Sequence, residues 1–343
     1  MIDFRYHLVS IVAVFLALTV GLVIGATALK PKVEDTLNRA SISEQHQITA
    51  QRAQIQDLKN QLSSDQAMAK AAAPRLLDGL LAGQRAVLVT APGADASTIT
   101  GVTAALQQAG AVVTGQAELQ SSFFDTSTST ESSLTTLAQQ VAPPSVALGG
   151  QTGQPTVNSK IFGQQEAARV LAPALVTKIG ADLPAQQTRK IVDGFVAQGF
   201  MSMTHENGTA LSQATLAVVI IPATQPSGGG ADPANLALLA VAQQLEESSL
   251  GVVMAGSLPG SGTGSAIDQL INGGTTFQMS SVDDASYEVG QIEVAQALSL
   301  VLTGHKPAAF GVLPNAVPSP APTPAPTSTP TPTRSSAKNK SGG

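Results

Sequence analysis

The chain has 343 residues and a formal net charge of −5, with 18 basic and 23 acidic side chains. This length predicts one large domain or two, plus accessory segments. The acidic balance, and the lack of a basic cluster interleaved with aromatic residues, argue against a protein that binds nucleic acid. The sequence contains no cysteine, which excludes disulfide bonds, cysteine-ligated zinc, iron–sulfur clusters and thiol nucleophiles. Only 3% of the residues are aromatic, so small aliphatic side chains must build most of the core.

An apolar segment near the N-terminus predicts a membrane helix. Residues 8–29 form a run of 22 residues without a charged side chain, and a helix needs about 20 apolar residues to cross the hydrocarbon core. A cleaved signal peptide is the alternative, because Ala26-Thr27-Ala28 has the small-x-small form of a cleavage site. The apolar regions of signal peptides span only about 7–15 residues. We therefore expect a retained transmembrane anchor over residues 1–32.

Small side chains recur every four residues along this predicted helix, at Ala13, Ala17, Gly21 and Gly25. Such a row lies along one helix face and lets two membrane helices approach closely, as in the GxxxG motif formed here by Gly21 and Gly25. Apolar helices also carry such pairs by chance. We interpret the row as a dimerisation surface.

The following segment, residues 33–80, predicts a coiled-coil stalk. It contains neither glycine nor proline between Val33 and Ala73. The apolar residues of its heptad pattern include Ile48, Ile55, Leu58 and Leu62, while several polar residues fall on the same seam. Such a mixed seam indicates a weak coiled coil, and a helix that packs on its own domain is the alternative. The anchor and the stalk together predict a parallel homodimer.

Residues 84–313 predict an α/β domain. The apolar run 86–90 is typical of a buried strand, a helix is expected over 96–108, and the next strand is expected over 111–114. These three elements form a β-α-β unit. The segment 120–160 is rich in Ser, Thr, Gln and Pro, and we expect it to be mostly loop or an insertion.

A second unit of the same kind follows in the C-terminal half. Strands are expected over 217–221 and 251–255, with a helix between them that ends near Ser248. Its start is marked by Asp232 as N-cap and Pro233 as the first helical residue. Apolar runs without alternation favour parallel strands that are covered on both faces. The expected fold is a doubly wound, mostly parallel α/β sheet, preceded by a transmembrane helix and a coiled-coil helix.

We find no catalytic constellation in this sequence, and we expect a protein that is not an enzyme and requires no cofactor. The glycine-rich stretch 256–265 lacks the lysine of a Walker A loop, and a plain flexible loop is expected there and at 228–230. The four histidines lie in different segments without a G-x-S-x-G elbow, so a serine hydrolase triad has no support. Asp283 and Asp284 are adjacent, and adjacent strand residues face opposite ways, so we expect a solvated loop or a helix cap.

One short segment has the chemistry of a copper site. If it is extended, Met201, Met203 and His205 project from one face at a period of two. Thioethers suit Cu(I) and imidazole also binds copper, so the three residues are candidate metal ligands. The alternative is that methionine fills gaps at the edge of a core.

The C-terminal segment 314–343 predicts a disordered tail. Residues 314–332 hold eight of the 21 prolines, spaced with Thr, Ala and Ser. Proline at this density denies the hydrogen bonds of helices and sheets, so an extended, polyproline-like chain is expected.

The sequence resembles the actinobacterial MctB family of copper transport outer-membrane proteins, whose members include SteB-like proteins. The resemblance is carried by MIDFRYHLVS at residues 1–10 with the apolar segment behind it, and by SSVDD (280–284), GQI (290–292) and AFGVLP (309–314). It implies a role in copper transport and homeostasis, with copper as the transported or bound ion. The alternative that it implies is a non-enzymatic division scaffold that works with a SteA-like membrane partner to regulate cell-wall hydrolysis. A third class, an enzyme on the same α/β scaffold, rests on the fold alone.

The orientation of the anchor is predicted differently by charge and by resemblance. Arg5 and the terminal amine precede the span, whereas Lys30, Lys32 and Arg39 follow it, so the positive-inside rule mildly favours a cytoplasmic domain. The family resemblance and the Thr/Pro-rich tail favour the outside. Because the charge difference is small, we expect an extracytoplasmic domain in the cell envelope.

Overall fold

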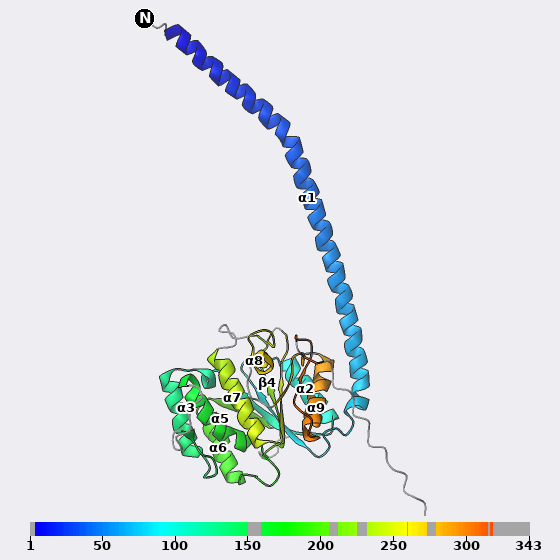
Figure 1. Cartoon of the computed structure of the whole chain (residues 1–343), viewed down its shortest axis with the longest axis vertical. Coiled ribbons are helices and arrows are strands. Elements are labelled where there is room, and N and C mark those ends of the chain that lie inside the picture. Colours follow the sequence, from blue (N-terminus) through cyan, green and yellow to red (C-terminus); the bar gives the residue numbers. More distant parts are fainter. Residues whose placement is uncertain are drawn as a thin grey trace, which may run out of the picture. The chain divides into compact units, whose positions relative to one another are not determined.

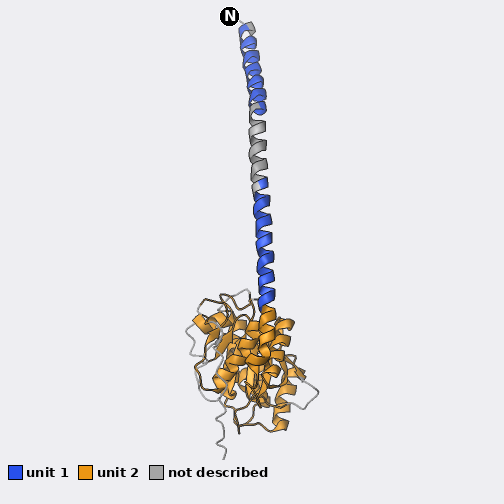
Figure 2. Cartoon of the chain, turned by 90° about the vertical axis from the view of Figure 1, so that its right-hand side faces the viewer, with its two compact units in different colours: residues 1–65 blue, residues 66–343 orange. Residues whose placement is uncertain are grey.

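The computed structural model describes residues 4–149, 159–205, 212–224, 232–258, 260–272, 279–314 and 316–317. The chain divides into two compact units, residues 1–65 and residues 66–343 (Figure 2). Helix α1 (Phe4–Leu77) begins in the first unit and ends in the second. The predicted tail beyond residue 317 lies outside the described residues.

The first unit is the N-terminal part of α1. Its segment Tyr6–Thr27 has 22 residues and a mean hydropathy of 2.7, so it is long and apolar enough to cross a membrane. The hydroxyls of Thr19 and Thr27 donate to the carbonyl oxygens of Phe15 (2.9 Å) and Val23 (2.6 Å). Their polar groups are thus satisfied within the helix, as the interior of a bilayer requires. A signal sequence would meet the same criteria, so retention of the segment stays a prediction.

The second unit is built on a seven-stranded sheet in the order β3-β2-β1-β4-β5-β6-β7. The strands are β1 (Arg85–Thr90), β2 (Val112–Leu119), β3 (Met201–His205), β4 (Leu216–Ile220), β5 (Gly251–Ala255), β6 (Ser280–Val282) and β7 (Ala309–Phe310). All pairings are parallel except that of β2 with β3. Because β1 has β2 on one side and β4 on the other, the chain winds outward in both directions. The predicted doubly wound, mostly parallel fold is confirmed.

Helices cover both faces of this sheet (Figure 1). They are α2 (Ala96–Gln108), α3 (Thr128–Val141), α5 (Phe162–Leu175), α6 (Ala185–Ala197), α7 (Pro233–Ser248), α8 (Ala266–Asn272) and α9 (Glu288–Leu302), with 3-10 turns η1 (Ser121–Phe124) and η2 (Ser159–Ile161). Helices α3, α5, α6 and α7 enclose one hydrophobic core, which we call the α7-side core. The last turns of α1, with α2 and α9, enclose the other, the α9-side core.

Strand β1 illustrates why polar and apolar residues do not alternate along these strands. Val87 and Val89 point into the α7-side core, whereas Ala86 and Leu88 point into the α9-side core. Both faces are buried under helices, so both sets of side chains are apolar.

Two helices have the bounds that local sequence signals predicted. Helix α2 spans the expected residues 96–108. Helix α7 begins at Pro233, and the Asp232 side chain accepts a hydrogen bond from the Ala234 N–H (2.8 Å). This is the cap that the Asp-Pro pair predicts.

The expectation that residues 120–160 are mostly loop or an insertion did not include helix α3. Ser127 caps this helix by accepting from the Thr130 N–H. Leu134, Leu137, Ala138 and Val141 are buried on one side of it, at the spacing of a helix face. The many Ser and Thr residues lie on its exposed side, where they concealed that spacing.

Candidate functional site

The copper candidates lie on β3, at one edge of the sheet. Met201 is opposite Leu119 and Met203 is opposite Ala117 on β2. Met201 is only 2% exposed and belongs to the α7-side core, and Met203 is partly buried against the same core. His205 ends the strand, and its side chain is not among those described. The two thioethers therefore share one face of β3, and this face is turned toward the interior.

This placement is what the core-filling alternative expects of methionine. A Cu(I) ion would have to reach the Met201 sulfur within a packed interior. Among the described residues, no group of three or more His, Cys, Asp or Glu side chains could hold a metal ion. The copper site at Met201, Met203 and His205 stays a prediction.

The predicted dimerisation residues lie along α1. Around Gly21 and Gly25, no heavy atom beyond the adjacent residues and the helix's own backbone lies within 4 Å of the position that a Cβ would take. Ala13 and Ala17 are exposed, and the heptad residues Ile48, Ile55, Leu58 and Leu62 are between 41% and 56% exposed. Exposed apolar side chains on a single chain are what a pairing surface requires. Because the structure contains one chain, the homodimer stays a prediction.

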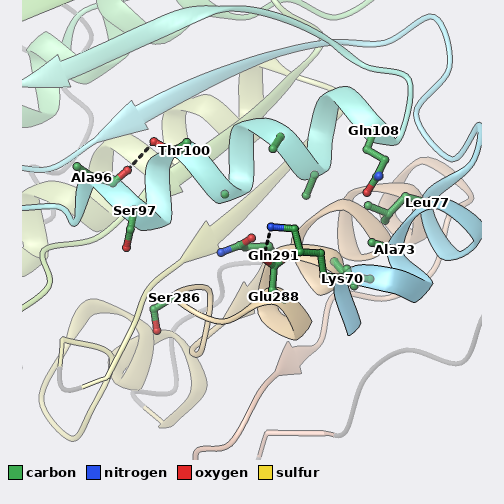
Figure 3. A pocket seen from close by; sticks show the side chains of 14 residues that line it. Lys70, Ala73, Leu77, Ala96, Ser97, Thr100, Gln108, Ser286, Glu288 and Gln291 are labelled. Atoms are coloured by element: carbon green, nitrogen blue, oxygen red, sulfur yellow. Dashed lines mark hydrogen bonds and ion pairs between the residues drawn. The ribbon is translucent and has the colours of Figure 1, made fainter. Parts of the chain in front are cut away.

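The second unit has a cavity of about 690 Å³ between the last turns of α1 and helices α2 and α9 (Figure 3). We call it the α1–α2–α9 groove. Apolar side chains of the α9-side core line its floor, including Ala73, Leu77, Ala105 and Ile292. Hydroxyl and amide side chains line the remainder, including Ser286 and Gln108.

A close approach of two helices shapes this groove. A Cβ on Gly101 of α2 would overlap the amide of Gln291 on α9, so a larger residue at position 101 would displace this flexible side chain. Gln291 is 9% exposed, and its amide lies between the two helices (Figure 3). Its side chain makes no hydrogen bond to any residue that the structure describes.

The charged side chains of the groove neutralise each other. The Lys70 Nζ lies 3.6 Å from Glu288 Oε1, with the two side chains 76% and 30% exposed. Exposed ion pairs of this kind contribute at most about 1 kcal/mol to the stability of the fold. The main effect of this pair is that the edge of the groove carries no net charge. The lining contains no thioether, imidazole or thiol, so it lacks the soft ligands that suit Cu(I).

A family model described as "Copper transport outer membrane protein, MctB" matches residues 1–320. The chain belongs to the MctB family. The copper transporter MctB of Mycobacterium leprae is 27% identical over 320 residues, which cover 91% of this chain and 96% of the relative. The copper transporters MctB of Mycobacterium bovis and Mycobacterium tuberculosis (strain H37Rv) are 24% identical with the same coverage. The resemblance predicted from the sequence is confirmed.

Two of the segments that carry the MctB resemblance meet at Asp283. Its carboxylate is fully buried and accepts hydrogen bonds from the backbone N–H groups of Val312 (2.8 Å) and Leu313 (3.1 Å). Gly311 lies between β7 and Val312. It has a φ of +125°, and a Cβ at this position would overlap the Asp283 carboxylate. Asp283 therefore ties residues 310–313 of this MctB-family chain to the end of β6.

The expectation of a solvated loop or helix cap was wrong for both carboxylates. Asp284 is 5% exposed. Burial, with a contribution from the neighbouring Asp283 carboxylate, raises the pKa of Asp284 to about 6. Helix α9 starts four residues later, and its N-cap residue Tyr287 makes no side-chain capping bond. Backbone donors from a distant segment satisfy the buried Asp283 carboxylate, which the local sequence does not reveal, whereas Asp284 Oδ1 is buried without a hydrogen-bond partner among the described residues.

Among the described residues of the glycine-rich stretch 256–265, the N–H groups of Gly256, Ser261, Gly264 and Ser265 donate to the chain itself. The Gly264 N–H donates to the Asp268 carboxylate (2.7 Å), and the Asp268 N–H donates to the Ser265 hydroxyl (3.0 Å). An acidic side chain at this place opposes the binding of an anion. The stretch 228–230 lies outside the described residues.

Sequence reasoning missed the groove. At its centre the Gln291 amide lies beside Gly101. The two residues are far apart in the chain, and the sequence alone does not predict that their helices pack against each other. The signal that could have found it is Gly101 itself, because a glycine inside a predicted helix often marks a close approach.

Proposed function

We propose that this MctB-family chain is a membrane-anchored envelope protein that acts in copper homeostasis, as a non-enzymatic component of copper transport or efflux. The observation that carries the proposal is the family match over residues 1–320, together with relatives named copper transporter that cover 91% of the chain. The apolar segment Tyr6–Thr27 supports the anchor.

The architecture favours an assembly over a pore formed by one chain. A single membrane helix encloses no interior path for an ion, and lipid cannot satisfy exposed backbone groups of an open sheet. The seven-stranded sheet is covered on both faces by helices, as in water-soluble domains. We therefore assign copper passage to an assembly that includes this chain and its partners.

The proposed placement has the second unit outside the cytoplasmic membrane. The Thr/Pro-rich tail and the family support it, against the small excess of positive charge that follows the apolar segment. Treating intact spheroplasts with protease tests it. The second unit should be digested in intact spheroplasts, and a protected unit would reverse the proposed orientation.

An alternative function is a scaffold in cell division, with a SteA-like partner in the membrane. The observation that favours it is helix α1, which joins the membrane segment to the α/β unit without interruption over 74 residues. A helix of this kind can transmit a rotation or a change of register.

Deletion of the gene separates the two functions. Copper sensitivity with normal septa supports copper transport. Chained or branched cells at ordinary copper levels support the scaffold and contradict a primary role in copper. Complementation with the full chain in the same strain is the control for both results.

A further inference from the structure

The α1–α2–α9 groove combines an apolar floor with a polar group that lacks a partner. The Gln291 amide is held at 9% exposure over Gly101 and has no hydrogen bond to the described residues. Gln291 lines the cavity, and neither of its amide atoms is among the fully enclosed unsatisfied atoms of the described residues. The amide is therefore open to a ligand that supplies both an acceptor and a donor at this place.

The lining indicates which class of ligand fits. The 14 residues that line the cavity include no aromatic side chain on which a sugar or a base could stack. The charged side chains Lys70 and Glu288 pair with each other, so the groove offers no net charge to an ionic ligand. A peptide backbone carries the matching carbonyl and N–H groups, and small side chains suit a floor of Ala73, Ala105 and Ile292. The chemistry therefore favours an uncharged peptide segment with small residues.

The chain itself contains such a segment. Residues 318–333 consist solely of Pro, Ala, Ser and Thr, and the first charged side chain after them is Arg334. Proline-rich segments favour the polyproline II conformation, so they lose little conformational freedom when they bind. Their proline carbonyls accept hydrogen bonds, and the N–H groups of Ala and Thr donate them.

The tail also starts close enough to reach the groove. The described chain ends at Val317, whose N–H donates to Ala309 of β7 (2.8 Å). In the sheet, β7 is four strands from β1, which is about 20 Å at a spacing of roughly 4.8 Å. At about 3.1 Å per residue, some seven residues cover this distance. More than half of the segment remains to lie in the groove.

We propose that the α1–α2–α9 groove binds the chain's own segment 318–333, with the Gln291 amide hydrogen-bonded to the tail backbone. Without aromatic rings in the floor, the affinity for the free peptide is weak, and tethering supplies an effective concentration in the millimolar range. Occupancy adds contacts between the tail and the last turns of α1, α2 and α9. Tail binding at the groove does not depend on the proposed copper function.

Amide hydrogen exchange in detergent micelles tests this binding. The full chain is compared with a chain that ends at Val317, both with the membrane helix. In the full chain, α2 and α9 should exchange about threefold to fivefold more slowly, because ligand binding suppresses local opening. Helix α7 on the other face of the sheet serves as the internal control and should not change. Equal exchange of α2 and α9 in the two chains would overturn the proposal.

A synthetic peptide of residues 318–333 provides the second arm. Added at about 2 mM to the shortened chain, it should restore the slow exchange of α2 and α9. The substitution Gln291→Met removes the amide at similar size, and it should weaken peptide binding by about tenfold, which corresponds to one lost hydrogen bond. Gln107→Met, on the exposed side of α2 outside the lining, is the matched control and should bind as the unmodified chain does. If the peptide restores slow exchange equally well in the Gln291→Met variant, the assigned contact with the Gln291 amide is refuted. If it does not restore slow exchange in the shortened chain without substitutions, tail binding is refuted.

Discussion

Replacing Asp284 with asparagine should stabilise the second unit at neutral pH. Burial, followed by the neighbouring Asp283 charge, raises the pKa of Asp284 from its ordinary value of 3.8 to about 6. The folded chain thus holds the proton more tightly than the unfolded chain does. The stabilisation from this tighter binding is fully present below about pH 4 and is lost as the pH rises through 6. The shift of about two pKa units corresponds to ~3 kcal/mol, which sets the upper limit of the gain at pH 7.5.

Thermal unfolding of the full chain in detergent, followed by circular dichroism between pH 5 and pH 8, measures this effect. For a unit of this size, a change of 1 kcal/mol shifts the midpoint by about 2–4 °C. The variant should therefore unfold up to roughly 6–12 °C above the unmodified chain at pH 7.5, and the gap should shrink toward pH 5. Asp78→Asn, at an exposed position, controls for the change in net charge. A gap that is absent at pH 7.5, or the same at every pH, would refute the reasoning.

Three further outcomes are expected. Asp283→Ala leaves two backbone N–H groups without their acceptor, so it should lower the free energy of unfolding by ~2–3 kcal/mol, measured by urea denaturation. Gly21→Ile with Gly25→Ile should abolish crosslinking of the membrane helices if they pair through small residues, and undiminished crosslinking would remove that interface. In a Cu(I) titration, Met201→Leu with Met203→Leu should weaken binding at least about tenfold if the thioethers are ligands; unchanged binding would dispose of the site.

Much of the α/β fold was predictable because its signals are local. The Asp232-Pro233 cap fixes the start of α7, and the apolar run of β1 reflects burial on both faces. Helix α3 escaped prediction because Leu134 and Leu137 are surrounded by Ser and Thr, which are common in loops as well as on exposed helix faces.

The candidate sites were less predictable because they depend on contacts between distant segments. Asp283 is buried by backbone donors that lie about thirty residues further along the chain. The Gln291 amide lies where a side chain at position 101 of another helix would otherwise be. In contrast, the alternation of Met201 and Met203 on one strand face follows from strand geometry alone, and only the burial of that face required the fold.

The two edges of the sheet differ in how readily a further strand can be added. Strand β7 has two residues, and Val317 is bridged to Phe310 beside it, so little backbone is left there for a neighbour. Strand β3 has five residues, and no described strand pairs with its outer side. Edges with unpaired backbone groups are where chains join laterally. If copies of the chain join laterally, the β3 side is the one that offers unpaired backbone among the described strands, so polar substitutions on that side should improve recovery of the protein.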